Sequence, residues 1–314
     1  MPNAPGGGYD TESRVLQPFL EKRLGATIVV NNQPGAGGLI GARTIVEARP
    51  DGRTLGLVGL PGFTVARLLG QESAPEPARD FTLLGRMSRS VHVWAVGSRS
   101  PIETIDDVLS AARRRPLVFP LNEITSVDFI GIAVPAALLG VPLEVVPGFE
   151  GTRAIALAAL RGDVDLIDGN VESLRSMLVA GELRPLLHIS TGPVEDDAMF
   201  TGVRVLGGAD GAAARYAPSV GHDVVWAIET AASLTRVIGS GRVIVGPRGL
   251  ASETTECLSK VLAEVLTSDD LRRVAPASLD PAAAAVVRQD TLALPADAAR
   301  LLPLLQPMLR KVRG

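Results

Sequence analysis

Two glycine-rich turns in the first forty residues each precede an amphipathic helical pattern. The first is Pro5-Gly6-Gly7-Gly8-Tyr9-Asp10, and the second is Pro34-Gly35-Ala36-Gly37-Gly38. Glycine has no Cβ atom, so its backbone N–H can approach a bound molecule closely. The first turn of a helix also presents unpaired N–H donors with partial positive charge. Two such turns at one site would bind an anion without lysine or arginine. The pattern therefore predicts an α/β protein that holds a carboxylate by backbone amides.

Length and composition limit the class of protein. The 314 residues suffice for one large or two ordinary domains, and 46% of them are hydrophobic. The formal net charge of −3 gives no electrostatic reason to expect nucleic-acid binding. Cys257 is the only cysteine, which excludes an intrachain disulfide and a cysteine-based metal cluster. Its apolar helical surroundings predict a buried structural thiol. No apolar run approaches the length of a membrane span.

Helical and strand patterns alternate along the chain, which indicates an α/β fold. We expect strands at 27–30, 55–60, 92–97, 117–119, 143–146, 164–167, 186–190 and 242–245. We expect helices at 11–24, 38–48, 102–113, 126–139, 152–161, 171–180, 211–216, 223–238, 252–266, 269–274 and 297–312. The pattern predicts two α/β lobes: residues 1–98 with 238–314 form the first, and residues 99–237 are inserted as the second. Two chain crossings would form a hinge, with the glycine turns facing a cleft at strand ends.

A fold of this kind would begin with a buried strand, and almost none of it precedes Gly6. We therefore expect a truncated or processed start, or a sheet that is completed in another way.

An ordered series of short motifs covers most of the chain. It includes the two glycine turns, Pro50-Asp51-Gly52, Val146-Pro147 and Gly162-Asp163-Val164-Asp165-Leu166. In these motifs the sequence resembles the tripartite tricarboxylate transporter substrate-binding family, also called the Bug receptors. The resemblance implies a type II periplasmic binding fold. It also implies a periplasmic receptor that delivers a small carboxylate to a membrane permease. We expect a monomer without a cofactor.

The second lobe departs from the pattern of that family. Its segment 120–126 keeps Thr125 and Ser126 but lacks the glycines of the family loop. Phe149 stands one residue after the position of the family's tyrosine, and a longer segment, 202–239, replaces the family's Pro-Thr-x-x-Glu-x-Gly. The resemblance therefore does not imply which carboxylate binds.

Candidate ligand contacts come from both lobes. The backbone of the first lobe would bind the carboxylate, unless its glycines only form tight turns, and the residues concerned are Gly6, Gly7, Gly8, Tyr9, Gly35, Ala36 and Gly37. Gly62 and Phe63 would lie at the cleft rim. Asp10 is expected to be a helix N-cap that accepts from the Ser13 N–H.

In the second lobe, the Thr125 or Ser126 hydroxyl would reach the cleft, unless Ser126 only caps the next helix. Phe149 would cover the carbon skeleton of the ligand. Asp168 would bind a ligand hydroxyl or ammonium group, because it follows a strand at the expected cleft edge.

Other chemistries lack a motif. His92, His188 and His222 show no metal-ligand spacing with one another or with a carboxylate pair, so we expect structural or surface histidines and no metal site. No nucleophile elbow, Walker loop or His-Glu-x-x-His motif is present, which argues against an enzyme. Gly35-x-Gly37-x-x-x-Gly41 resembles a dinucleotide-binding fingerprint. Residues 31–34 separate it from its strand, however, and the next strand ends in Gly59-Leu60-Pro61 without the acidic residue that binds the ribose, which argues against NAD(P) binding.

The remaining alternatives to a receptor are a sensor domain for a signalling partner and an enzyme on the same bilobed scaffold.

Overall fold

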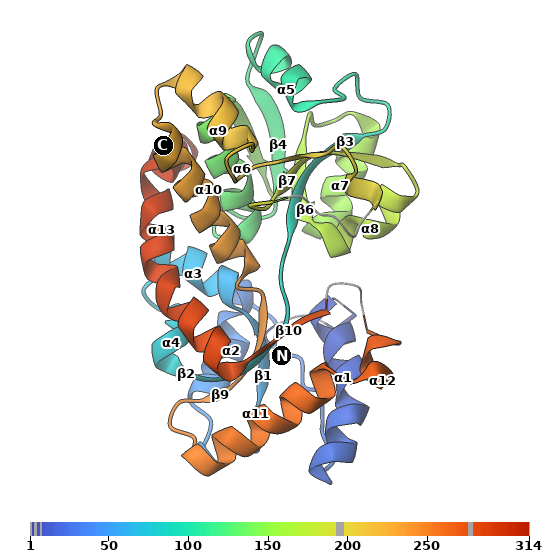
Figure 1. Ribbon diagram of the computed structural model, residues 1–314, viewed down its shortest axis with the longest axis vertical. Coiled ribbons are helices and arrows are strands. Elements are labelled where there is room, and N and C mark those ends of the chain that lie inside the picture. The colour runs from blue at the N-terminus through green and yellow to red at the C-terminus, as the bar shows by residue number, and fades with distance from the viewer. Residues whose placement is uncertain (1, 3–4, 7, 193–197, 276–278, 314) are drawn as a thin grey trace. The chain divides into compact units, whose positions relative to one another are not determined.

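A computed structural model describes residues 2, 5–6, 8–192, 198–275 and 279–313 as two compact α/β units (Figure 1). Unit 1 contains Met1–Ser90 and Gly239–Pro295, and unit 2 contains Val91–Ile238 and Ala296–Gly314. The chain passes between the units after Ser90, after Ile238 and, inside the last helix, after Pro295. The lobes drawn from the sequence, 1–98 with 238–314 and 99–237, stay a prediction.

Unit 1 is built on a four-stranded sheet in the order β1-β9-β2-β10, and each neighbouring pair is antiparallel. These strands are β1 (Gly56–Gly59), β9 (Arg242–Pro247), β2 (Phe81–Ser88) and β10 (Leu279–Ala283). Helix α1 (Gly8–Leu24) packs against α11 (Ser252–Leu266), which contacts β2 (Figure 1). The apolar face of α1 therefore joins one core, whose buried members include Leu16, Leu20, Leu57, Leu84, Ile244, Leu258 and Leu262.

Smaller elements complete unit 1. They are η1 (Ala36–Gly38), α2 (Leu39–Val46), α3 (Leu60–Leu68), α4 (Pro77–Asp80), α12 (Asp269–Arg272) and the first part of α13 (Ala284–Arg313). Helix α13 is longer than the predicted helix at 297–312. Its buried stripe recurs every three or four residues from the start, through Val287, Thr291, Leu294, Ala298 and Leu301, which is the spacing of one helix face.

Three sequence expectations in unit 1 are wrong. Residues 27–30 form no strand, and the Val29 side chain is 83% exposed. The predicted strand at 55–60 runs one residue too far, because α3, which was not predicted, begins directly at Leu60 with Pro61 in its first turn, where the missing N–H of proline is tolerated. Cys257 is exposed rather than buried, because Leu258 and Leu262 define the buried face of α11 and Cys257 lies off it.

Unit 2 contains a sheet in the order β6-β3-β7-β8 and a separate parallel pair, β4-β5. Its strands are β3 (His92–Gly97), β4 (Leu117–Leu121), β5 (Leu143–Pro147), β6 (Ile167–Asn170), β7 (Leu183–Ile189) and β8 (Arg204–Val205). Its helices are α5 (Ile105–Ala112), α6 (Val127–Leu139), α7 (Gly151–Arg161), α8 (Val171–Val179), η2 (Ala198–Phe200), α9 (Ala212–Tyr216), η3 (Ala217–Val220) and α10 (Val224–Gly239), whose last residue belongs to unit 1. Strand β3 pairs antiparallel with β6 and β7, and α6 contacts β6, so residues on one face of β3 and β6 lie beneath α6.

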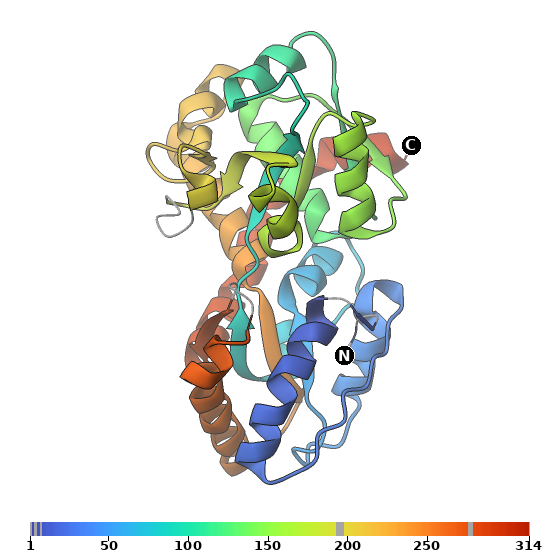
Figure 2. The same ribbon diagram turned by 90° about the vertical axis from the view of Figure 1, so that its right-hand side faces the viewer.

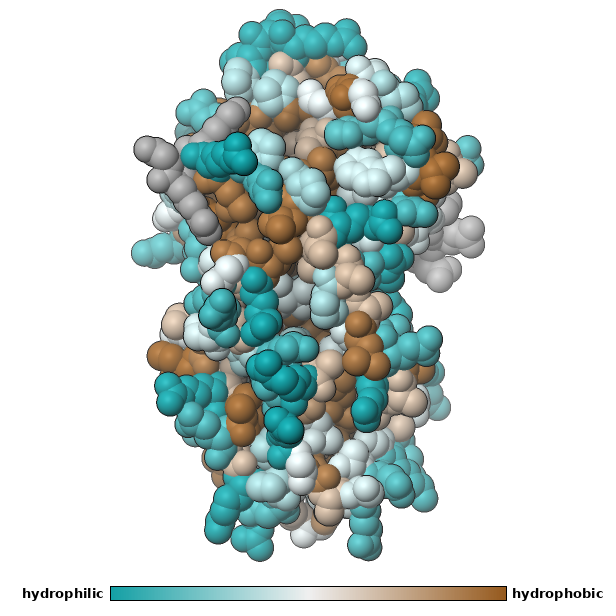
Figure 3. Space-filling model, turned by 90° about the vertical axis from the view of Figure 1, so that its left-hand side faces the viewer, coloured by the Kyte–Doolittle hydropathy of each residue, from teal (hydrophilic) through white to brown (hydrophobic). Residues whose placement is uncertain are grey.

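No helix in the described part of the chain combines the length and apolar character needed to cross a bilayer. Several apolar side chains are nevertheless exposed, among them Val225 of α10 and Leu292 of α13. Figure 3 shows apolar areas on one face of the molecule among many hydrophilic side chains.

Candidate functional site

The first glycine turn ends where α1 begins. Gly6 has a φ of +77°, a left-handed conformation that favours glycine. Its N–H donates to the Asp10 carboxylate over 2.9 Å. Gly8 is the first residue of α1, and Gly7 lies outside the described residues. Asp10 is therefore not the N-cap that the sequence predicts: it lies inside the first turn of α1, and its carboxylate reaches back to a backbone donor before the helix.

Asp10 also connects the first turn to the segment before the second. It accepts from Arg14 Nε at 3.0 and 3.1 Å, and Arg14 Nη2 donates to Asn32 Oδ1 at 3.4 Å. The bonds from Arg14, Gly6 and Asn32 lower the pKa of Asp10 to about 2, because each donor favours the carboxylate form. Asp10 is committed to these donors, so its charge is already balanced beside the turn.

A cation that sequence reasoning missed lies under the start of α1. The Arg242 guanidinium is 4.3 Å from the centre of the Tyr9 ring and pairs with Glu12, whose side chain is 3% exposed. A Cβ atom on Gly8 would lie 3.3 Å from two guanidinium nitrogens, so glycine there permits the close approach of Arg242. The Tyr9 hydroxyl lies against Gly59, and burial raises the pKa of Tyr9. Arg242 starts the returning strand β9, so no local motif marks it.

The second glycine turn is exposed and left-handed. The φ angles along residues 35–38 are +125°, +48°, +64° and +91° in chain order. Among the described residues, Ala36 alone has a positive φ without being a glycine. Residues 35–37 are exposed, so their backbone is accessible. Pro2 packs against Gly38 and Gly41, which brings the start of the chain beside this turn (Figure 2). Within unit 1, the segment that carries the first turn therefore contacts the segment that carries the second, through Arg14 and Asn32 and through Pro2.

The other predicted contact in unit 1 lies in α3. Gly62 is in the first turn of the helix, and a Cβ atom there would meet nothing within 4 Å. Phe63 is 3% exposed, and its ring stacks on Phe81 with centroids 6.0 Å apart. Phe63 thus contributes to the core of unit 1, and its ligand contact stays a prediction.

The predicted contacts of unit 2 lie on several elements. Thr125 and Ser126 are half-buried and directly precede α6. Ser126 is the N-cap residue, but its side chain makes no capping bond. Phe149 donates its N–H to the Leu121 carbonyl at 3.2 Å and packs on the core of the unit.

Asp168 is buried among protein groups rather than open at a strand end. Its side chain has no exposed surface, and its Oδ2 atom lies 2.7 Å from His92 Nδ1. The β3–β6 register pairs Trp94 with Asp168, so His92, Trp94 and Asp168 share the face that α6 covers. Trp94 Nε1 donates to the Gly131 carbonyl at 2.9 Å. A Cβ atom on Gly131 would lie 2.5 Å from Asp168 Oδ2, so the carboxylate packs directly on the α6 backbone.

Asp128, in the first turn of α6, completes a cluster that the sequence did not predict. Its Oδ1 atom is 4.0 Å from His92 Nδ1, and its side chain is 27% exposed. The sequence shows no metal-ligand spacing for His92, because His92 and Asp168 are 76 positions apart and only the sheet register brings them together. His188 is buried with its ring edge on Phe200, and His222 packs on Trp226.

Burial and the charges of the neighbouring groups shift the pKa values of all three side chains in this cluster. Burial raises the pKa of Asp128 to about 6, while nearby His92 opposes the shift. Burial likewise raises the pKa of Asp168 against the effect of His92. Burial alone would lower the pKa of His92, but its two carboxylate neighbours outweigh that effect and raise it.

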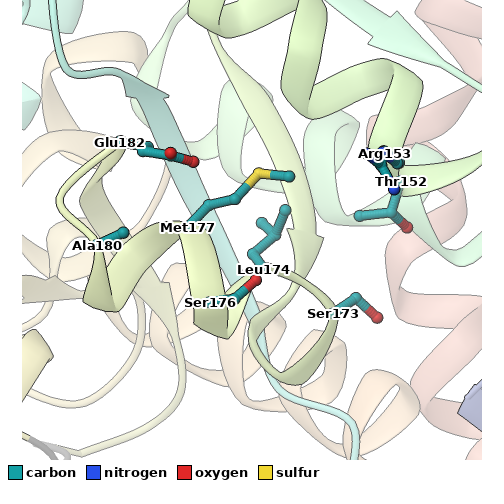
Figure 4. Close-up of a pocket in the computed structure, with 8 residues that line it drawn as sticks. All are labelled: Thr152, Arg153, Ser173, Leu174, Ser176, Met177, Ala180 and Glu182. Atoms are coloured by element: carbon teal, nitrogen blue, oxygen red, sulfur yellow. The ribbon is translucent and has the colours of Figure 1, made fainter.

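A pocket of about 470 Å³ lies between α7 and α8 of unit 2 (Figure 4). Polar groups come from both helices, and the lining residues are Thr152, Arg153, Ser173, Leu174, Ser176, Met177, Ala180 and Glu182. None of the ligand contacts predicted from the sequence lines this pocket.

Comparison with known proteins settles the family. Residues 13–206 match the model of the tripartite tricarboxylate transporter family receptor, TctC. The chain belongs to this family.

The sequence aligns with known relatives over different shares of its length. A UPF0065 protein from Pseudomonas sp. strain P51 is 29% identical over 188 residues, which are 59% of this chain and 55% of that protein. A second UPF0065 protein, from Bordetella bronchiseptica, is 26% identical over 293 residues, which are 92% of this chain and 78% of that protein. The match thus spans little more than half of the first relative.

Solved structures have the same fold. Rpa4515 from R. palustris with adipate has a TM-score of 0.72 and 21% identity, with 96% of this chain and 93% of that chain covered. MatC from Rhodopseudomonas palustris with bound malate has a TM-score of 0.68 and 21% identity, with 94% and 96% covered. The type II periplasmic binding fold predicted from the sequence is confirmed.

Proposed function

We propose that this chain is a periplasmic receptor that captures a small carboxylate and delivers it to the membrane permease of a tripartite tricarboxylate transporter. Membership of the receptor family carries the proposal. Two members of the fold are described with adipate and with malate, both of which are dicarboxylates. A dicarboxylate is therefore the ligand class to test first.

The exposed left-handed backbone of the second turn supports binding by main-chain N–H groups. Residues 35–37 are exposed, and no side chain is needed to present their N–H groups. Hydrogen bonds to a charged group contribute about 1.5–3 kcal/mol each, so four amide donors would contribute about 6–12 kcal/mol. Association costs about 4–15 kcal/mol, so the amides alone give weak binding. Thr125, Ser126 and Phe149 stay predicted as sources of further contacts, whereas the Asp168 side chain is fully buried against His92.

The family is one of transporter receptors, and we propose that this member performs no catalysis. The charged side chains beside the first turn support this proposal. Arg242 is engaged by Glu12 and Tyr9, and Asp10 is engaged by Gly6 and Arg14. Groups committed in this way fix a turn in place rather than exchange protons with a substrate.

A thermal-shift screen tests the ligand class. Adipate, malate and a series of other mono- and dicarboxylates would be added to the full chain, and binding would be confirmed by isothermal titration calorimetry. We expect at least one acid to raise the melting temperature, because a ligand at one hundred times its Kd stabilises the folded state by about 2.7 kcal/mol. If no acid raises it, carboxylate capture is wrong.

A matched pair of glycine variants tests the first turn. Gly6 and Gly181 have φ values of +77° and +67°, and a Cβ atom on either would meet nothing within 4 Å. Alanine therefore causes similar backbone strain at both positions. The Gly6 N–H donates to Asp10, so Gly6 would act through the shape of the turn. We expect Gly6→Ala to weaken binding of the active acid at least tenfold, about 1.4 kcal/mol, and Gly181→Ala to leave the Kd unchanged. Equal affinities in the two variants would remove the first turn from the site.

A further inference from the structure

The cluster of His92, Asp128 and Asp168 in unit 2 has no part in the proposed capture of a carboxylate by backbone amides. The three residues come from β3, the first turn of α6, and β6. One potential ligand atom from each lies within 4.8 Å of the other two. An imidazole nitrogen and two carboxylate oxygens are ligands of divalent transition metals such as Zn²⁺ and Mn²⁺.

The distances are close to those around one shared ion, and small side-chain movements would complete the fit. Zinc binds nitrogen and oxygen ligands at about 2.0–2.2 Å, so two ligands of one ion lie at most about 4.4 Å apart. His92 Nδ1 is 2.7 Å from Asp168 Oδ2 and 4.0 Å from Asp128 Oδ1. The ion would need only a small separation of His92 from Asp168, and rotation of the partly exposed Asp128 would supply the third ligand.

One buried oxygen of the cluster has no hydrogen-bond partner among the described residues. It is Asp168 Oδ1, which belongs to a carboxylate with no exposed surface. Buried polar atoms without partners are costly and uncommon, so each calls for an explanation. A bound cation would explain the Asp168 oxygen directly.

Charge points to a cation as well. Two carboxylates face a single imidazole, and the exposed fractions of the His92, Asp168 and Asp128 side chains are 5%, 0% and 27%. A buried carboxylate that stays ionised needs a paired charge or a metal, and otherwise takes up a proton. Asp128 alone is accessible, so an ion would enter past Asp128.

We propose that His92, Asp128 and Asp168 form a binding site for one divalent transition-metal ion. The site ties β3, β6 and α6 together. Three protein ligands leave a fourth position of a tetrahedral ion open to water or to another donor. This inference is independent of the proposed receptor role.

Zn²⁺ titration of the full, untagged, chelator-treated chain tests the proposal by isothermal titration calorimetry. We expect one site with a Kd in the micromolar range or lower. Asp128→Asn and His92→Gln should each weaken Zn²⁺ binding at least tenfold. The matched controls are Asp163→Asn, at an exposed carboxylate, and His222→Gln, at a half-buried histidine outside the cluster, and both should bind as the parent chain does.

Asp128→Asn preserves shape at a partly exposed position, so this variant should fold even if His92→Gln does not. Co²⁺ gives a second readout, because its visible absorption reports ligands directly and should disappear in Asp128→Asn. Absence of Zn²⁺ binding at 100-fold excess over a micromolar Kd would overturn the proposal. Binding that Asp128→Asn leaves intact would overturn it too, and the cluster would then be a hydrogen-bonded His–Asp pair only.

Discussion

Gly131→Ala should destabilise unit 2 although alanine is the better helix former. Gly131 lies in α6, where the new methyl group would be 2.5 Å from Asp168 Oδ2, 2.8 Å from Cγ and 3.0 Å from Oδ1. The new methyl group would thus overlap the whole carboxylate at the end of the Asp168 side chain. Because His92 holds that carboxylate from the other side at 2.7 Å, Asp168 must leave its partner or α6 must move.

The magnitude follows from two opposing effects. Breaking a buried ion pair costs about 3–5 kcal/mol. Replacing glycine by alanine inside a helix recovers about 0.5–1 kcal/mol. The net loss of unfolding free energy should be about 2–4 kcal/mol. Gly62→Ala is the matched control, because Gly62 also lies in a helix and its Cβ would meet nothing within 4 Å. That variant should be as stable as the parent chain or up to about 1 kcal/mol more stable.

Urea unfolding followed by far-UV circular dichroism, which reports on both units, and by Trp94 fluorescence, which reports on unit 2, measures the difference. Trp94 is fully buried and donates to the Gly131 carbonyl, so it reports on this contact. A Trp226→Phe background removes the other tryptophan, and a chelator removes any bound metal. A loss under 1 kcal/mol for Gly131→Ala, or an equal loss for Gly62→Ala, would refute the reasoning.

Two further predictions concern unit 1. Arg242→Gln should cost about 3–5 kcal/mol in urea unfolding, because it removes the cation beside buried Glu12. Arg43→Gln breaks an exposed pair and should cost less than about 1 kcal/mol; equal losses would contradict the role of burial. The bonded Asp10 has a folded-state pKa of about 2, below its ordinary value of 3.8, so its stabilising effect is complete above pH 3.8 and is lost as the pH falls through about 2. The stability difference between the parent chain and Asp10→Asn should therefore shrink between pH 5 and pH 2, and a constant difference in unfolding free energy would contradict this linkage.

Local pattern predicted the elements that have a regular apolar stripe or a short apolar run. The predicted helices in α1 and α11 and the predicted strand in β3 are confirmed within a few residues at their ends. Strand β2 was missed, and the exposed Val29 belongs to an apolar run that pairs with no strand. Strand pairing is non-local, so a run of β-branched residues does not by itself make a strand.

The two glycine turns were visible in the sequence because glycine marks left-handed backbone locally. The His92 cluster was not visible, because its members are ordinary residues far apart in sequence. Antiparallel register places Trp94 opposite Asp168, and the absence of a side chain on Gly131 lets the carboxylate approach α6. Finding the cluster from the sequence would have required the pairing register of β3 and β6, and no single motif encodes that register. Arg242 was missed for the same reason.

The exposed thiol of Cys257 on α11 has a practical consequence. The protein carries one cysteine, so a maleimide dye or biotin would attach at a single place without any change to the sequence. That attachment point is in unit 1 and outside the glycine turns. A fluorophore or a surface tether could therefore be installed there in one step.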